Sequence, residues 1–243
     1  MSASIKPFEK YMPKAIKHFW AARQIAAAKQ KARGARDQGN RASVTAGKNL
    51  DGFVEMVKRL IVENGVGNCE IYTAGRAHLT IPGFFRPTKN WDLLVVRNHH
   101  LLAAIEFKSQ VGPSFGNNFN NRVEEALGNA ADINTAYREG VFGESMKPFV
   151  GYMFVLEDCD ESRKPVKLSS PHFSAMPEFE NTSYAQRYEI LCRKLVQEQL
   201  YDAAALVMTS KGRSGNWSDL SEISSARRFA ITLAGRIAAQ SLT

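Results

Sequence analysis

The stretch that decides the fold is residues 90–110, NWDLLVVRNHHLLAAIEFKSQ, in which two apolar runs flank a polar tetrapeptide. The runs are Leu93–Val96 and Leu101–Ile105, and the tetrapeptide is Arg97-Asn98-His99-His100. Aliphatic and β-branched runs bounded by turn residues predict a β-hairpin.

Three charged residues lie at the open end of this predicted hairpin. A turn centred in the tetrapeptide would set Asp92 opposite Ile105, one position from Glu106. Because side chains alternate along a strand, Glu106 and Lys108 project together, with residues 105 and 107 behind them. Two close carboxylates repel each other by about 1 kcal/mol in water. The cluster therefore predicts a bound cation, and its hard oxygen ligands suit Mg²⁺, with Mn²⁺ as a substitute.

A plainer interpretation is a solvated edge strand whose Asp, Glu and Lys form surface ion pairs. The five apolar residues before Glu106 favour a central strand instead, buried on both faces. Charges at the end of such a strand indicate pairing or function.

The composition predicts a globular chain with one sizeable core, or one core with a helical subdomain. The chain has 243 residues, of which 44% are hydrophobic and 23% charged. It contains neither an apolar run of about 18 residues, as a membrane span needs, nor an N-terminal apolar signal core. Its three cysteines form no C-x-x-C pair, which is typical of reduced thiols, and we expect a cytoplasmic protein.

The excess positive charge lies in the first fifth of the chain. Residues 1–48 carry eleven Lys and Arg but two Asp and Glu, whereas the remainder carries 21 and 22. This pattern favours an anionic partner, with nucleic acid ahead of a membrane surface, although a merely solvated helix has the same composition. We expect two units, a basic N-terminal arm (1–48) and a second domain (49–243).

Further elements follow from the periodicity of apolar residues. Helices are expected at 8–33, 49–64, 120–138, 183–199 and 219–240, and strands at 70–72, 78–81, 148–157 and 203–209. The segments 34–48, 109–122 and 158–181 read as loops. The last helix, with Ile223, Phe229, Ile231 and Leu233, is our guess for a subunit interface.

Candidate DNA contacts are basic or amide side chains in the predicted loops. The backbone and the base edges of DNA accept hydrogen bonds from such groups. A plain turn-rich loop at 109–122 is an equally good interpretation. The candidates are Arg36, Arg41, Arg86, Lys89, Asn117, Asn118, Asn120, Asn121 and Arg122.

The order of elements around Trp91-Asp92 and Glu106-Phe107-Lys108 resembles the PD-(D/E)xK nuclease fold, with Trp91 replacing the proline. The segments 86–96 and 104–122 look more specifically like the XhoI family of type II restriction endonucleases. The resemblance implies an α/β fold with a mixed central sheet flanked by helices, here with the basic helical arm added. It also implies a Mg²⁺-dependent homodimer that cuts double-stranded DNA at the palindrome CTCGAG, and a cognate DNA methyltransferase.

On this hypothesis Asp92, Glu106 and the backbone carbonyl of Phe107 bind the metal, and Lys108 orients the attacking water. Two alternatives stay open at this point. One is a repair or transposon-end nuclease with the same fold, and the other is a catalytically inert DNA-binding module.

Overall fold

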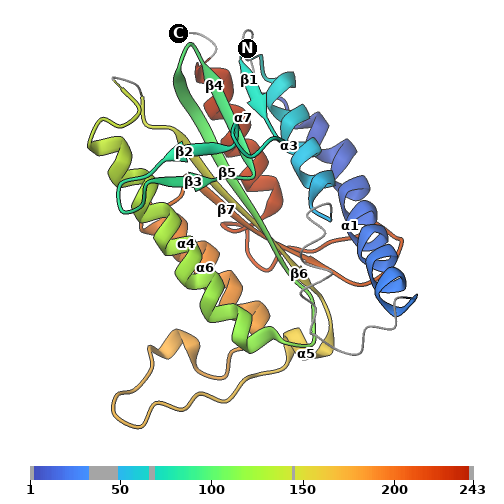
Figure 1. Cartoon of the computed structure of the whole chain (residues 1–243). Coiled ribbons are helices and arrows are strands. Elements are labelled where there is room, and N and C mark those ends of the chain that lie inside the picture. Colours follow the sequence, from blue (N-terminus) through green and yellow to red (C-terminus); the bar gives the residue numbers. More distant parts are fainter. Residues whose placement is uncertain (1–2, 33–48, 66–68, 144–145, 241–243) are drawn as a thin grey trace.

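The fold is built on a five-stranded mixed sheet (Figure 1). The computed structural model describes residues 3–32, 49–65, 69–143 and 146–240. The strand order is β1-β4-β5-β6-β7, antiparallel from β1 to β5 and parallel from β5 to β7. The predicted α/β fold with a mixed central sheet is confirmed. The strands are β1 (Glu70–Tyr72), β4 (Leu93–Arg97), β5 (His100–Gln110), β6 (Phe149–Glu157) and β7 (Ala203–Thr209).

Helices cover both faces of the sheet and enclose two apolar cores. One face packs against α1 (Lys6–Ala32), α3 (Asp51–Glu63) and α7 (Ala226–Gln240). The other packs against α4 (Phe115–Arg138) and α6 (Tyr184–Gln197). The predicted loop 158–181 also contains two short helices, α5 (Asp160–Arg163) and η1 (Pro177–Phe179). Within the described ranges, no helix has the length and apolar character needed to cross a bilayer.

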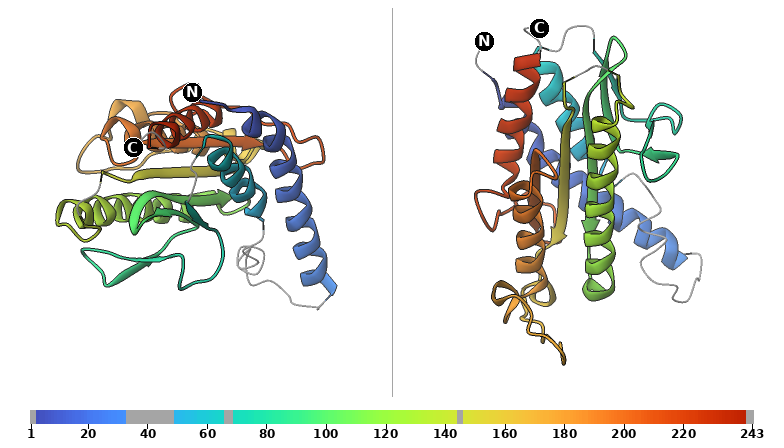
Figure 2. Two further views of the ribbon diagram at one scale, coloured as in Figure 1. Left: turned by 90° about the horizontal axis from the view of Figure 1, so that it is seen from above. Right: turned by 90° about the vertical axis from the view of Figure 1, so that its left-hand side faces the viewer.

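A separate two-stranded hairpin precedes β4 along the chain. It consists of β2 (Thr80–Pro82) and β3 (Thr88–Asn90), which pair antiparallel. Both views in Figure 2 show it outside the main sheet, on the side of α4. The sequence predicted a strand at 78–81, which overlaps β2, but no strand at β3.

The β4–β5 hairpin has a tight two-residue turn and a bulge. Asn98 and His99 both have positive φ angles, 49° and 65°, as a type I′ turn requires. The register then shifts, because Val95 pairs with Ala103 whereas Val96 pairs with Leu101. Leu102 is therefore the extra residue of a β-bulge, and it packs on the same face as Ala103.

The bulge corrects the predicted register of the hairpin by one residue. Leu93 pairs with Ile105, so the same register continued by one residue sets Asp92 opposite Glu106. The expected pairing of Asp92 with Ile105 was wrong, because sequence periodicity does not reveal an inserted residue. Directly opposite residues share a face, so the corrected register brings the two carboxyl groups closer than predicted.

The expectation of a central, two-sided strand is confirmed. β5 lies between β4 and β6, and residues 101–107 of it are buried. β6 is buried from Phe149 to Leu156. The alternative of a solvated edge strand at Glu106 is therefore wrong.

The helix of the N-terminal arm is part of the core. Phe8, Met12, Phe19 and Trp20 of α1 are buried together with residues of α3 and α7. A division of the chain after residue 48 stays a prediction. The predicted basic loop 34–48, with Arg36 and Arg41, lies outside the described residues.

Two predictions for the later helices need correction. Helix α4 begins at Phe115, so residues 115–121 are helical and do not form a loop. The guessed interface on the last helix is also wrong in part, because Phe229 and Leu233 are buried in the core. The remaining interface candidates, Ile223 and Ile231, are exposed.

Candidate active site

Glu106 lies at the centre of a buried charged cluster on the α4 face of β5. Its side chain is 2% exposed. Its Oε2 accepts a hydrogen bond from Lys89 Nζ of β3 at 2.9 Å, and its Oε1 pairs with Lys108 Nζ two residues along the same strand. One buried carboxylate is thus paired with two ammonium groups.

Asp92 joins this cluster from the start of β4. Its Oδ2 accepts a hydrogen bond from the backbone N–H of Phe107 at 2.8 Å, which fixes the carboxyl group beside β5. The sequence predicted that Asp92, Glu106 and Lys108 would meet on one patch, and the structure brings them together. Lys89 was predicted nearby as a phosphate contact, but its pairing with Glu106 was missed.

The cluster shifts the pKa values of Asp92 and Lys108. Burial raises the pKa of Asp92 to about 6, and the negative charge of Glu106 adds to the rise. Burial lowers the pKa of Lys108, but Glu106 and Asp92 outweigh it and leave that pKa above its ordinary value. The ammonium of Lys108 therefore stays charged at neutral pH.

The donor set of this cluster fits a divalent cation of the magnesium type. Among the residues that the structure describes, no group of three or more His, Cys, Asp or Glu could hold a metal ion. Two carboxylates are nevertheless the usual protein share of a Mg²⁺ site, because this ion keeps several waters and also binds phosphate oxygens. The raised pKa of Asp92 is a second sign of fit, since a cation between the acids would relieve their repulsion.

A buried aspartate on α4 anchors the chain just before the cluster. Asp132 accepts hydrogen bonds from the N–H groups of Phe84 and Phe85, both at 2.8 Å, and from Arg86 Nε at 2.7 Å. Arg86 also donates to Asn129 Oδ1 at 2.7 Å. Burial raises the pKa of Asp132, but Arg86 and the two N–H groups outweigh it and hold that pKa below its usual range.

This anchor changes the role expected for Arg86. Its guanidinium ties the loop of the β2–β3 hairpin to α4, so a DNA contact stays a prediction for its remaining N–H groups. Gly83 fits the anchor because a Cβ there would meet the Asp132 carboxylate at 2.5 Å. The sequence did not indicate the anchoring roles of Asp132 and Asn129, because polar residues on a helix are usually solvated.

The amide-rich segment forms the first two turns of α4. Asn117, Asn120 and Asn121 are exposed, whereas the Asn118 amide donates to the carbonyl of Ser114 at 2.6 Å. A helix N-terminus attracts anions through its free N–H groups and dipole. DNA contact by these amides stays a prediction.

Arg122 lies one turn further along α4. It pairs with Glu125 three residues on, and its Nε has no hydrogen-bond partner in the described part of the chain. A phosphate contact by Arg122 also stays a prediction.

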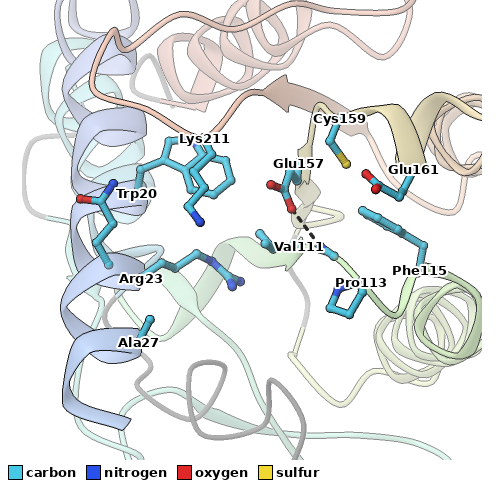
Figure 3. Close-up of a pocket in the computed structure, with 12 residues that line it drawn as sticks. Trp20, Arg23, Ala27, Val111, Pro113, Phe115, Glu157, Cys159, Glu161 and Lys211 are labelled. Atoms are coloured by element: carbon cyan, nitrogen blue, oxygen red, sulfur yellow. Dashed lines mark hydrogen bonds between the residues drawn. The ribbon is translucent and has the colours of Figure 1, made fainter. Parts of the chain in front are cut away.

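A cavity of about 520 Å³ lies at the end of β5. Figure 3 shows Arg23 of α1 and Lys211 pointing toward it, with Glu157 facing them from the end of β6. Arg23 donates to Ser109 Oγ at 3.1 Å. Because side chains alternate, Ser109 projects from the face opposite to Glu106 and Lys108. This α1 cavity is therefore separate from the carboxylate cluster.

Comparison with known proteins assigns the family. The family model described as Restriction endonuclease XhoI matches residues 29–221. No solved structure matches the chain significantly.

Three curated relatives are type II restriction enzymes. BstVI of Geobacillus stearothermophilus is 52% identical over 181 residues, covering 72% of this chain and 80% of the relative. XhoI of Xanthomonas vasicola is 44% identical over 196 residues, covering 81% and 78%. AbrI of Azospirillum brasilense is 50% identical over 173 residues, covering 71% and 77%. The matched segment includes the cluster around Glu106, and the chain belongs to the XhoI family of type II restriction endonucleases.

Proposed function

We propose that the chain cuts both strands of double-stranded DNA at the palindrome CTCGAG and leaves 5′-phosphate ends with 5′ overhangs. The observation that carries this proposal is the cluster of Asp92, Glu106 and Lys108 on one buried face of the sheet. The names of the relatives support the restriction activity, and the CTCGAG site follows from the family resemblance.

In this proposal Asp92, Glu106 and the backbone carbonyl of Phe107 would hold one or more Mg²⁺ ions, with Mn²⁺ as a substitute. Such an ion would supply Lewis-acid polarisation of the scissile phosphate and a lower pKa of a bound water. The N–H of Phe107 keeps the Asp92 carboxyl aimed at the shared site. Two oriented carboxylates on rigid strands need little rearrangement when the substrate binds.

Lys108 acts on the attacking water and on the phosphoryl oxygens. Its ammonium, held by Glu106, orients the water and offsets the negative charge that grows on the phosphate. In-line attack by this water displaces the 3′ oxygen and leaves the phosphate on the 5′ end.

The target also implies partners. A palindrome is read by two copies related by a two-fold axis, so we propose a homodimer. We propose that a cognate DNA methyltransferase protects the host DNA, and that both proteins act in the cytoplasm. DNA contacts are proposed for Arg36, Arg41, Arg86, Lys89, Asn117, Asn118, Asn120, Asn121 and Arg122.

A plasmid digest tests the function. A supercoiled plasmid with one CTCGAG site is incubated with and without Mg²⁺, and the cut ends are sequenced. We expect one linear product, only with the metal, with both strands cut within the site. A plasmid without the site is the control and should stay supercoiled.

Other outcomes point to the alternatives. Nicks or a smear independent of sequence would favour a repair nuclease with the same fold. DNA binding without any cutting under both conditions would favour an inert DNA-binding module.

A further inference from the structure

We propose that Lys89 is a second catalytic lysine that changes partner during the reaction. Its ammonium pairs with Glu106 before a divalent cation binds and moves to a phosphate oxygen of the DNA when the cation takes its place. This proposal rests on the nuclease function proposed above and adds a step to it.

The first argument is competition for the carboxylate of Glu106. Lys108 holds Oε1, and Lys89 Nζ lies 2.9 Å from Oε2. A divalent cation bound to this carboxylate would lie close to both ammonium groups. The repulsion between such charges is strong in a partly desolvated site, so one ammonium must move away.

The second argument is that groups other than Glu106 can stabilise the ammonium of Lys89. Its Nζ also donates to the carbonyl of Asn90 at 2.6 Å and lies 5.0 Å from the centre of the Trp91 ring. A carbonyl and an aromatic face both stabilise an ammonium without a carboxylate. Lys89 can therefore leave Glu106 without becoming an unpaired charge.

Lys108 lacks this freedom. It lies two residues after Glu106 on the same rigid central strand, and Asp92 also attracts its ammonium. Lys89 instead comes from the separate β2–β3 hairpin, which meets the cluster from outside the main sheet (Figure 2). The two lysines thus differ in origin although they share one carboxylate.

The third argument concerns where the ammonium goes. The side chain of Lys89 is 14% exposed, so it lies at the border between the buried cluster and solvent. A phosphate that completes the coordination of a cation at Glu106 would lie within reach of this border. There the ammonium would stabilise negative charge that develops on the phosphoryl oxygens.

The test measures cation binding without DNA. Ca²⁺ affinity is determined by calorimetry for the full-length wild-type protein, Lys89→Met and the control Lys164→Met. Methionine keeps the apolar stem of Lys89 and removes only the competing charge, and Lys164 is an exposed lysine. We expect Lys89→Met to bind Ca²⁺ about tenfold more tightly than the other two proteins, because a competing state is removed.

A second measurement follows single-turnover cleavage with Mg²⁺. We expect Lys89→Met to cut at least about 100-fold more slowly despite its tighter cation binding. Lys89→Arg, which keeps the charge, should restore the weaker Ca²⁺ affinity. Circular dichroism and thermal melting confirm that each variant is folded.

Two results would overturn the proposal. One is a Ca²⁺ affinity of Lys89→Met that equals or falls below that of the wild type, and the other is unchanged cleavage. The calorimetry needs no DNA, so it stays interpretable even if the wild-type protein cuts no plasmid, which would instead refute the proposed function.

Discussion

The two faces of β5 carry buried charge in opposite ways. On the α4 face, Glu106 is 2% exposed and pairs with both Lys89 and Lys108. On the α1 face, Arg23 donates to the neutral Ser109 hydroxyl, its only side-chain acceptor among the described residues. Its Nε has no hydrogen-bond partner in the same part of the chain.

The comparison shows how the partners of a buried charge decide whether a ligand can replace them. Burial lowers the pKa of Arg23 to about 10, and Glu157 offsets only part of that effect. Arg23 is compensated only in part, by the Ser109 hydroxyl, the Phe19 ring 4.8 Å from its guanidinium and the charge of Glu157, and incomplete compensation costs stability. Glu106 is compensated by ammonium groups, which a cation can replace at the carboxylate and which can in turn pair with a phosphate.

The largest effect on cleavage is expected when one charged side chain of the Glu106 cluster is removed. We expect Asp92→Ala, Glu106→Ala and Lys108→Ala each to lower the cleavage rate at least about 1,000-fold while DNA binding persists. Plasmid digestion measures the first and gel shift the second. The control is Glu124→Ala, an exposed acid on α4. Cleavage retained by any of the three would refute its assigned role.

A smaller effect should come from the anchor that positions the hairpin of Lys89. Asp132→Ala leaves Arg86 Nε and two backbone N–H groups without their acceptor. We expect the free energy of unfolding to fall by about 3 kcal/mol, measured by urea denaturation. Asp160→Ala, which changes an exposed acid, should stay within about 0.5 kcal/mol of the wild type. Equal losses in both variants would contradict an anchoring role.

The pH dependence of stability tests whether burying the ionised Asp92 carboxylate destabilises the folded protein. The pKa of Asp92 is about 6 in the folded protein against an ordinary 3.8, so the folded state binds the proton more tightly. Ionising Asp92 therefore removes stability as the pH rises from about 4 to about 6. In the presence of a chelator we expect Asp92→Asn to exceed the wild type by roughly 1–3 kcal/mol at pH 7.5.

This gain should shrink toward zero at pH 4.5, where the wild-type carboxyl is largely protonated in the folded state. Urea denaturation at both pH values measures it. The same difference at both values would show that the burial of Asp92 is not the cause.

The smallest effect should come from the α1 face. Arg23→Met replaces an incompletely compensated buried charge by an apolar side chain of similar length. We expect the free energy of unfolding to change by no more than about 1 kcal/mol, in either direction. Gln24→Met, at an exposed neighbour that lines the same cavity, is the control. A loss well above that size would mean that Arg23 is better compensated than the hydrogen bonds indicate.

The local elements and the meeting of Asp92, Glu106 and Lys108 could be predicted from the sequence. Strands 148–157 and 203–209 agree with β6 and β7 to within a residue, because near-continuous apolar runs are typical of buried parallel strands. Asp92, Glu106 and Lys108 were predicted together because the hairpin that joins them is local in the chain.

Contacts between residues far apart in the chain could not be predicted from the sequence. The bond between Arg86 and Asp132 joins residues 46 positions apart, and nothing in either local pattern indicates it. The helical start of α4 was missed because residues rich in Gly and Asn favour turns, and packing of Phe115 and Phe119 overrode that preference. On α4, Leu127 is 43% exposed while Asn129 and Asp132 are buried, which reverses the usual preference of these residue types.

The bulge at Leu102 decides which residue of β5 stands opposite Asp92, and therefore whether the two acids of the proposed active site share a face of the sheet. If the same residues paired without a bulge, Asp92 would stand opposite Ile105 and share its face, on the far side of the sheet from Glu106. A shift of the β4–β5 register by one residue beyond the bulge would therefore separate the two acids without touching either of them.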